Sequence, residues 1–249
     1  MATKNGSLRW PRLTQLLLHT ARNYLHVYSH AQSDAVGIPD SRVKFYRQYL
    51  REANARKRVL EKRLKLTVAK KKRLNPEVHL RHPFAQDIYG QSELHYTVGK
   101  RKGDIVRKLL ELRFDPNLRD AVGRTPFMIS CEMGNLEMAK LLYEFGAAVN
   151  SHDFLFGFTP LISAVALNNV ELARFLIACG ANVDIPDFVG ETPTIHAVVR
   201  DHVACVELLI KSNANLERKS ISHETPLSIA QRCKFEEIAR LLLDAGPKS

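Results

Sequence analysis

A Thr-Pro pair recurs at nearly constant spacing through the second half of the chain. Successive pairs lie 34, 33 and 33 residues apart and begin at Thr125, Thr159, Thr192 and Thr225. A period of this length indicates stacked copies of one small supersecondary unit, each of which buries its apolar face against its neighbours. The fold is therefore expected to be a repeat array rather than a closed globule, and to present a long surface to other molecules.

The residues around each pair predict two short helices per unit. Thr can cap the free N–H groups of a first helical turn, and Pro suits the first helical position because its missing N–H has no intrahelical partner there. In the copy that begins at Thr125, residues 127–133 form the first predicted helix and residues 136–145 the second. Gly146 then permits the left-handed backbone that ends this helix. The predicted fold class is all-α.

The same segments resemble the ankyrin repeat family. That family follows a turn containing Asp and Gly with Thr-Pro-Leu-His, an Ala pair, a Leu-Leu run and Gly-Ala-Asp-Val-Asn. The matching segments include Gly157-Phe-Thr-Pro-Leu161, Gly190-Glu-Thr-Pro193, Gly146-Ala-Ala-Val-Asn150 and Gly180-Ala-Asn-Val-Asp184. The resemblance implies an ankyrin-repeat solenoid of helix-turn-helix units with short hairpin turns. Its five repeats are expected at about residues 86–118, 119–150, 151–184, 185–217 and 218–246.

One departure from the family pattern concerns the histidine after Thr-Pro-Leu. It is present only as His95 in the first copy, where Ser92-Glu93 replaces Thr-Pro. The later copies carry Met128, Ile162, Ile195 and Ser228 at this position. In the family this histidine ties neighbouring repeats by hydrogen bonds, so its replacement predicts a stack that is held together more by apolar packing.

Charge divides the chain into two regions. Residues 1–80 hold 18 Lys or Arg against 5 Asp or Glu, a net charge of +13, while residues 81–249 carry a net charge of −2. Residues 1–39 read as an amphipathic helix followed by a linker, and residues 40–80 read as a long basic helix that ends near Asn75-Pro76. Residues 81–249 form the predicted ankyrin domain.

The basic helix has three readings. Its charged residues are interpreted as a solvated helix face, as a contact surface for an anionic partner, or as a nuclear import signal. An anionic partner could be nucleic acid, an acidic protein or a membrane surface, bound through residues 40–74. The residues concerned are Arg56, Lys57, Arg58, Lys62, Arg63, Lys70, Lys71, Lys72 and Arg73.

Composition bears on the compartment. No apolar run approaches the roughly 18 residues that span a bilayer. The four cysteines stand singly with no CxxC pair, which favours a reducing compartment, the cytoplasm or the nucleus. An alternative is a mitochondrial presequence, because the first 33 residues contain four Lys or Arg and no acidic residue.

The ankyrin resemblance also implies where partners bind. Partners of the family contact the turn tips before Thr-Pro and the exposed face of each first helix, and these positions are largely apolar here. The third turn carries one extra residue in its Phe-Leu-Phe-Gly-Phe run. Phe154 and Phe158 could instead fold beneath their own turn. The candidate partner-binding residues are Tyr89, Val122, Arg124, Met133, Phe154, Phe156, Phe158, Leu167, Phe188, Val189 and Arg200.

No motif in the sequence indicates catalysis. A phosphate-binding glycine loop, Gly-x-Ser-x-Gly and His-Glu-x-x-His are all missing, and the histidines lack partners at metal-ligand spacing. We therefore expect no enzyme activity, cofactor or metal. The sequence favours a protein–protein interaction adaptor or scaffold that binds a hydrophobic protein segment. The alternatives are a nucleic-acid-associated nuclear protein and a structural subunit of a large assembly.

Overall fold

The computed structural model describes residues 86–87 and 90–246. The described part of the chain contains ten helices and no strand, which confirms the predicted all-α repeat fold. None of these helices is long and apolar enough to cross a membrane. The helices predicted within residues 1–80 lie outside the described residues, and the predicted domain boundaries stay predictions.

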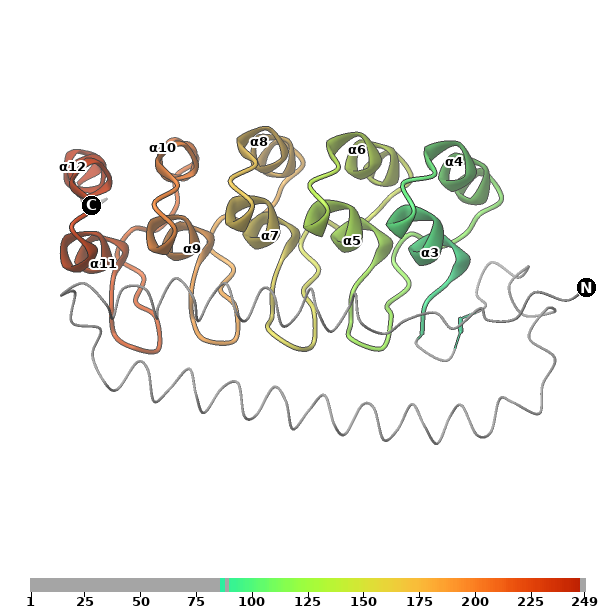
Figure 1. Ribbon diagram of the computed structural model, residues 1–249, viewed down its shortest axis with the longest axis horizontal. Helices are drawn as coiled ribbons and strands as arrows, with labels where there is room; N and C mark the ends of the chain where they lie inside the picture. The colour runs from blue at the N-terminus through green and yellow to red at the C-terminus, as the bar shows by residue number, and fades with distance from the viewer. Residues whose placement is uncertain (1–85, 88–89, 247–249) are drawn as a thin grey trace, which may run out of the picture. The chain divides into compact units, whose positions relative to one another are not determined.

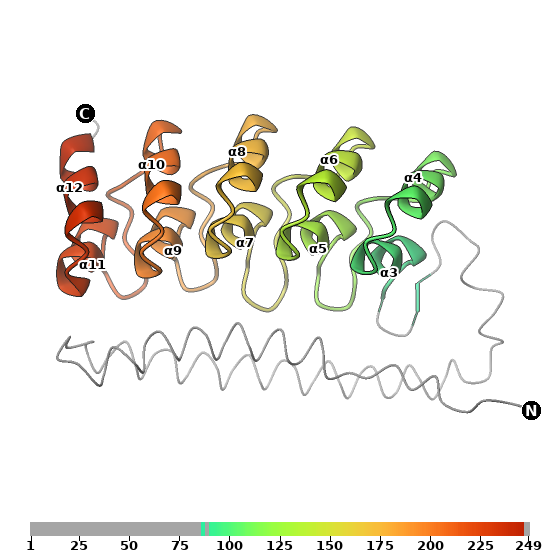
Figure 2. The same ribbon diagram turned by 45° about the horizontal axis from the view of Figure 1, so that its top comes forward.

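The helices form five pairs, one pair per repeat. Figures 1 and 2 show the first helices side by side in one row and the second helices in another, with the connecting turns all on one side. The pairs are α3 (Glu93–Gly99) with α4 (Gly103–Glu111), α5 (Pro126–Glu132) with α6 (Leu136–Glu144), α7 (Pro160–Ala166) with α8 (Val170–Ala178), α9 (Pro193–Val199) with α10 (Val203–Lys211), and α11 (Pro226–Cys233) with α12 (Glu236–Ala245).

Each Thr-Pro pair begins a first helix as predicted. The Thr125 side chain accepts a hydrogen bond from the N–H of Met128, with Pro126 at the start of the helix. The threonines that precede α7, α9 and α11 make the same cap. In the first repeat Ser92 takes this role and shares a reciprocal capping box with His95. The periodic signal in the sequence is therefore a signal of helix starts.

The core lies between neighbouring repeats and is mainly aliphatic. Met128, Ile162 and Ile195, which replace the family histidine, are all buried. His95 keeps the expected tie, because its Nε2 lies 3.1 Å from the carbonyl oxygen of Arg124 in the next repeat. The structure thus confirms both a hydrogen-bonded junction at the first histidine and apolar junctions where the histidine is replaced.

A second set of hydrogen bonds joins the loops that follow the second helices. Asn117 donates from Nδ2 to the carbonyl oxygen of Gly146, and its Oδ1 accepts the N–H of Ala148. Asn150 repeats both bonds one repeat later, with Gly180 and Asn182. These bonds fix the spacing of successive repeats where the chain leaves each second helix and enters the next hairpin turn.

Candidate protein-binding surface

Each hairpin turn before α5, α7 and α9 is built around one buried aspartate. Asp120 Oδ1 accepts two backbone N–H groups of its own turn, at 3.0 and 2.9 Å. Asp187 Oδ1 repeats this arrangement at 3.0 and 2.8 Å. Asp153 accepts three N–H groups, two at 2.7 Å and one at 2.8 Å, and so accommodates the extra residue of the third turn. The aspartates fix the turn conformations, because a buried N–H without a partner is costly.

Backbone hydrogen bonds join the third, fourth and fifth turn tips to the tip before each of them. The N–H groups of Phe154, Phe188 and Ile221 donate to the carbonyl oxygens of Val122, Phe156 and Val189, at 2.8, 2.9 and 3.2 Å respectively. The donor directly follows Asp153, Asp187 or Ser220. The tips therefore form a ladder that continues from repeat to repeat.

Glycines in the turns allow the side chains of the ladder to lie flat on the preceding tip. A Cβ on Gly123 would lie 2.5 Å from the ring of Phe154, and a Cβ on Gly157 would lie 2.6 Å from the ring of Phe188. Both glycines also have a positive φ, which a side chain would strain. The two phenylalanine rings are thus held in one place by the turns beneath them.

We call Phe154, Phe188 and Ile221 the tip row. Although fixed by the ladder, their side chains remain 49%, 43% and 49% exposed. The Arg119 guanidinium lies 5.4 Å from the centroid of the Phe154 ring. The His152 ring meets Phe188 edge-on at 6.1 Å. Aligned, pre-ordered apolar side chains in water are typical of interaction sites, where aromatic anchors and Arg supply much of the binding energy.

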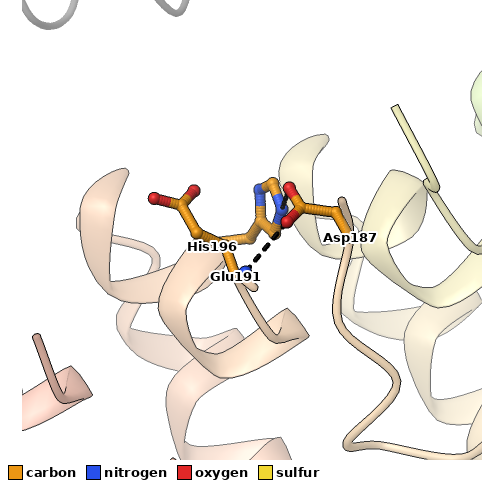
Figure 3. A group of neighbouring side chains, drawn as sticks. All are labelled: Asp187, Glu191 and His196. Carbon is orange, nitrogen blue, oxygen red and sulfur yellow. Dashed lines mark hydrogen bonds and ion pairs between the residues drawn. The ribbon is translucent and has the colours of Figure 1, made fainter. Parts of the chain in front are cut away.

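A buried cluster beneath the fourth turn connects the tip to helix α9. Figure 3 shows the His196 imidazole beside Asp187, with Glu191 nearby. His196 Nε2 lies 3.0 Å from Asp187 Oδ2, and Arg200 Nη1 lies 3.1 Å from His196 Nδ1 and 3.0 Å from the His196 carbonyl oxygen. Burial raises the pKa of Asp187, and the hydrogen bond and charge of His196 oppose this rise.

The donor set of this cluster suits a structural bond better than a metal site. One ligand atom from each of Asp187, Glu191 and His196 lies within 4.8 Å of the others. However, both Asp187 oxygens already accept hydrogen bonds. The Arg200 guanidinium beside Nδ1 would also repel a cation. We therefore assign the cluster to holding the fourth turn on α9.

Comparison with known proteins identifies the fold family. A family model described as "Ankyrin repeats (3 copies)" matches residues 94–187 and 185–249, which together make up more than half of the chain. The chain belongs to the ankyrin repeat family. A stretch of 66 residues is 38% identical to a protein of Oryza sativa subsp. japonica named probable E3 ubiquitin-protein ligase XBOS32. That stretch is 26% of this chain and 13% of the relative, so the chain matches only a small part of the relative's length.

The predicted tip residues of the ankyrin surface differ in exposure. Phe154 and Phe188 stand outward in the tip row, and Phe154 does not fold beneath its own turn. Val122 and Phe156 are partly exposed, whereas Val189 is only 6% exposed. The sequence reasoning missed Ile221, which follows Ser220 as Phe154 follows Asp153. The signal that would have found it is the position directly after the turn aspartate or its replacement.

The remaining predicted residues lie on or near the first helices of the ankyrin repeats. Leu167, which follows α7, is 51% exposed, while Met133 after α5 is partly exposed. Phe158 is partly exposed and contacts two rings, Phe156 at 5.5 Å and His196 at 5.2 Å between centroids. Arg200 is partly exposed and bonded to His196. Contact of these residues with a partner stays a prediction.

Arg124 lies inward, in a network of ion pairs. It is 7% exposed. Its guanidinium donates to Asp120 Oδ2 at 2.8 and 3.0 Å and to Glu132 Oε2 at 3.3 Å. This geometry ties the second turn to the end of α5, as the Asp187 cluster ties the fourth turn to α9. The structure gives Arg124 a supporting role in the turn, and its direct contact with a partner stays a prediction.

The Glu132 carboxyl group makes stability depend on pH. Burial raises its pKa from 4.5 to about 7, although the Arg124 charge opposes the rise. The folded protein then holds a proton that the unfolded chain has released between these two pKa values. This contribution to the free energy of unfolding is complete at low pH and is lost as the pH rises through 7.

Glu132→Gln is therefore expected to gain stability relative to the unmodified protein as the pH rises from 5 to 8. The relative gain should be about 1 kcal/mol, a discounted value because the side chain is not fully buried. Urea unfolding of both proteins at several pH values measures it. Groups that do not interact with Glu132 titrate equally in both proteins and cancel in the difference. A difference that stays constant with pH would contradict the assignment.

Other predicted site residues lie outside the described residues. They are Tyr89 and the basic residues at positions 56–58, 62, 63 and 70–73. Their roles stay predictions.

Proposed function

We propose that this protein is a non-catalytic adaptor whose ankyrin repeats hold a partner protein. The turn tips and the exposed ends of the first helices form the binding surface. The observation that carries the proposal is the tip row, since three apolar side chains from successive repeats are both fixed in place and about half exposed. A pre-ordered surface loses little side-chain entropy when it binds, so its apolar area contributes more of its energy to affinity.

The absence of catalysis is part of the same proposal. The rice relative matches over 66 residues, the length of two repeats of this chain, and 13% of its own length. That segment supports shared repeats and gives no support for ligase chemistry here. In the described part of the chain, the buried His196 side chain bonds to the buried Asp187 and to the partly exposed Arg200. This supports a structural use of these three ionisable groups.

The basic segment supplies the second arm of the proposal. Its support is the net charge of +13 over residues 1–80, against −2 for the rest. We propose that residues 40–74 contact an anionic surface or a second subunit, and that the protein acts in the cytoplasm or the nucleus. Binding of this segment to nucleic acid, or its burial in a larger assembly, are the alternatives.

Affinity purification with the full chain and with a chain lacking residues 1–80 separates the two arms. We expect the principal protein partner to be retained by the shortened chain. Molecules bound by the basic segment should be lost, and their capture by the full chain should fall steeply with added salt. Loss of the principal partner on removal of residues 1–80 would contradict the assignment of partner choice to the repeats.

A further inference from the structure

We propose that the ankyrin turn tips bind a peptide segment in which apolar residues alternate with or adjoin acidic residues. This inference rests on the proposed function and adds the chemistry of the partner. Its basis is a second row of side chains, which are basic and lie beside the apolar side chains of the tip row.

The second row occupies the position just before each turn aspartate or its replacement. We call Arg119, His152 and Lys219 the basic row; the other two turns have Gln86 and Pro186 at this position. His152 and Lys219 are exposed and Arg119 is partly exposed. A basic-row residue directly precedes its turn aspartate or Ser220, whereas a tip-row residue directly follows it. The third and fifth turns carry a residue of each row.

Contacts confirm that the two rows adjoin. Arg119 lies 5.4 Å above the Phe154 ring of the next repeat, and His152 meets the Phe188 ring of the next repeat. Arg119 Nη1 donates to the carbonyl oxygens of Gly123 and His152, at 3.0 and 2.8 Å, so its guanidinium is held in this position. Among the described residues neither Arg119 nor Lys219 forms an ion pair. Within the described part of the chain, no carboxylate neutralises these two charges.

The acidic residues of the same turns face the other way. Asp120, Asp153 and Asp187 are all buried, and each spends its carboxylate on backbone N–H groups or on a buried side chain. These three aspartates therefore add no exposed negative charge beside the tip row and the basic row. Charge complementarity favours an acidic ligand on such a surface, and rim charges act mainly on specificity and association rate.

The full chain can select its ligand from a random peptide display library. Before each round, the library is depleted on the full chain carrying Phe154→Ser and Phe188→Ser, which keeps residues 1–80 and so removes peptides that bind the basic segment. We expect the remaining peptides to contain Leu, Ile or Phe together with about twice the library frequency of Asp and Glu. Selected peptides without this acidic enrichment would overturn the inference.

Charge variants of the full chain then test the basic row itself. Lys219→Glu is expected to weaken a selected acidic peptide about tenfold and to leave its Asn/Gln counterpart unchanged. Lys108→Glu, the same charge change on exposed α4, should leave both affinities unchanged. Equal loss with both variants, or no loss with Lys219→Glu, would overturn the inference.

Two outcomes separate this inference from the proposed function. If the depleted library yields apolar peptides with no acidic preference, the tips bind a partner but its chemistry is not acidic. A second outcome is that no selected peptide depends on Phe154 and Phe188 for binding, or that the only segment that binds the turn tips is residues 1–80 of the same chain. Both the inference and the proposed binding surface are then wrong.

Discussion

Replacing Asp187 with alanine is expected to lower the free energy of unfolding by about 3 kcal/mol. Its Oδ1 accepts two backbone N–H groups of the fourth turn and its Oδ2 lies 3.0 Å from His196 Nε2. All of these groups are buried. The substitution leaves several donors without a partner, and each unsatisfied buried donor costs about 1–3 kcal/mol. Urea unfolding of the full chain, monitored by circular dichroism, measures the change in the free energy of unfolding.

A matched control is Asp184, which lies three residues earlier in the chain. Asp184→Ala removes a partly exposed carboxylate that accepts a single N–H, that of Asn215, and should cost no more than about 1 kcal/mol. Asp187→Asn should fall between the two, because the amide oxygen can still serve the turn while its NH₂ group opposes the His196 Nε2 donor. Equal losses for Asp187→Ala and Asp184→Ala would show that the cluster does not hold the turn.

Replacing Phe154 and Phe188 together with serine is expected to weaken partner capture about 100-fold or more. Each exposed aromatic anchor at a binding centre contributes about 1–2 kcal/mol or more, and 1.4 kcal/mol corresponds to a factor of ten. Fold stability should change far less than capture, since both rings are about half exposed and the ladder bonds run through the backbone. Circular dichroism of the double variant checks that the repeats are intact.

Sequence reasoning succeeded where the chemistry is local. Thr125 and Pro126 identify a helix start by themselves, because capping and the missing N–H act within one helical turn. The tie made by His95 also followed, since the family pattern fixes both the residue and its role. The repeat fold and its helix pairs could therefore be predicted from the residues alone.

Whether a given side chain of a turn is exposed or buried could not be predicted in the same way. Phe188 and Val189 are adjacent apolar residues in one tip, yet one stands outward and the other is buried. The difference arises from hydrogen bonds between residues 32 positions apart, which set each tip on the previous glycine. Arg124 is similar in part, because its guanidinium bonds to Glu132 eight residues away as well as to Asp120 in its own turn. Local patterns carry no information about such contacts.

The most direct test of the central claim compares capture by two double variants of the full chain. One carries Phe154→Ser and Phe188→Ser in the tip row. The other carries Leu112→Ser and Leu243→Ser, which also remove two exposed apolar side chains but lie after α4 and within α12. Quantitative mass spectrometry of the captured proteins should show the principal partner lost with the tip-row variant and retained with the control. Retention by the folded tip-row variant, or equal loss from both, would contradict the proposed binding surface.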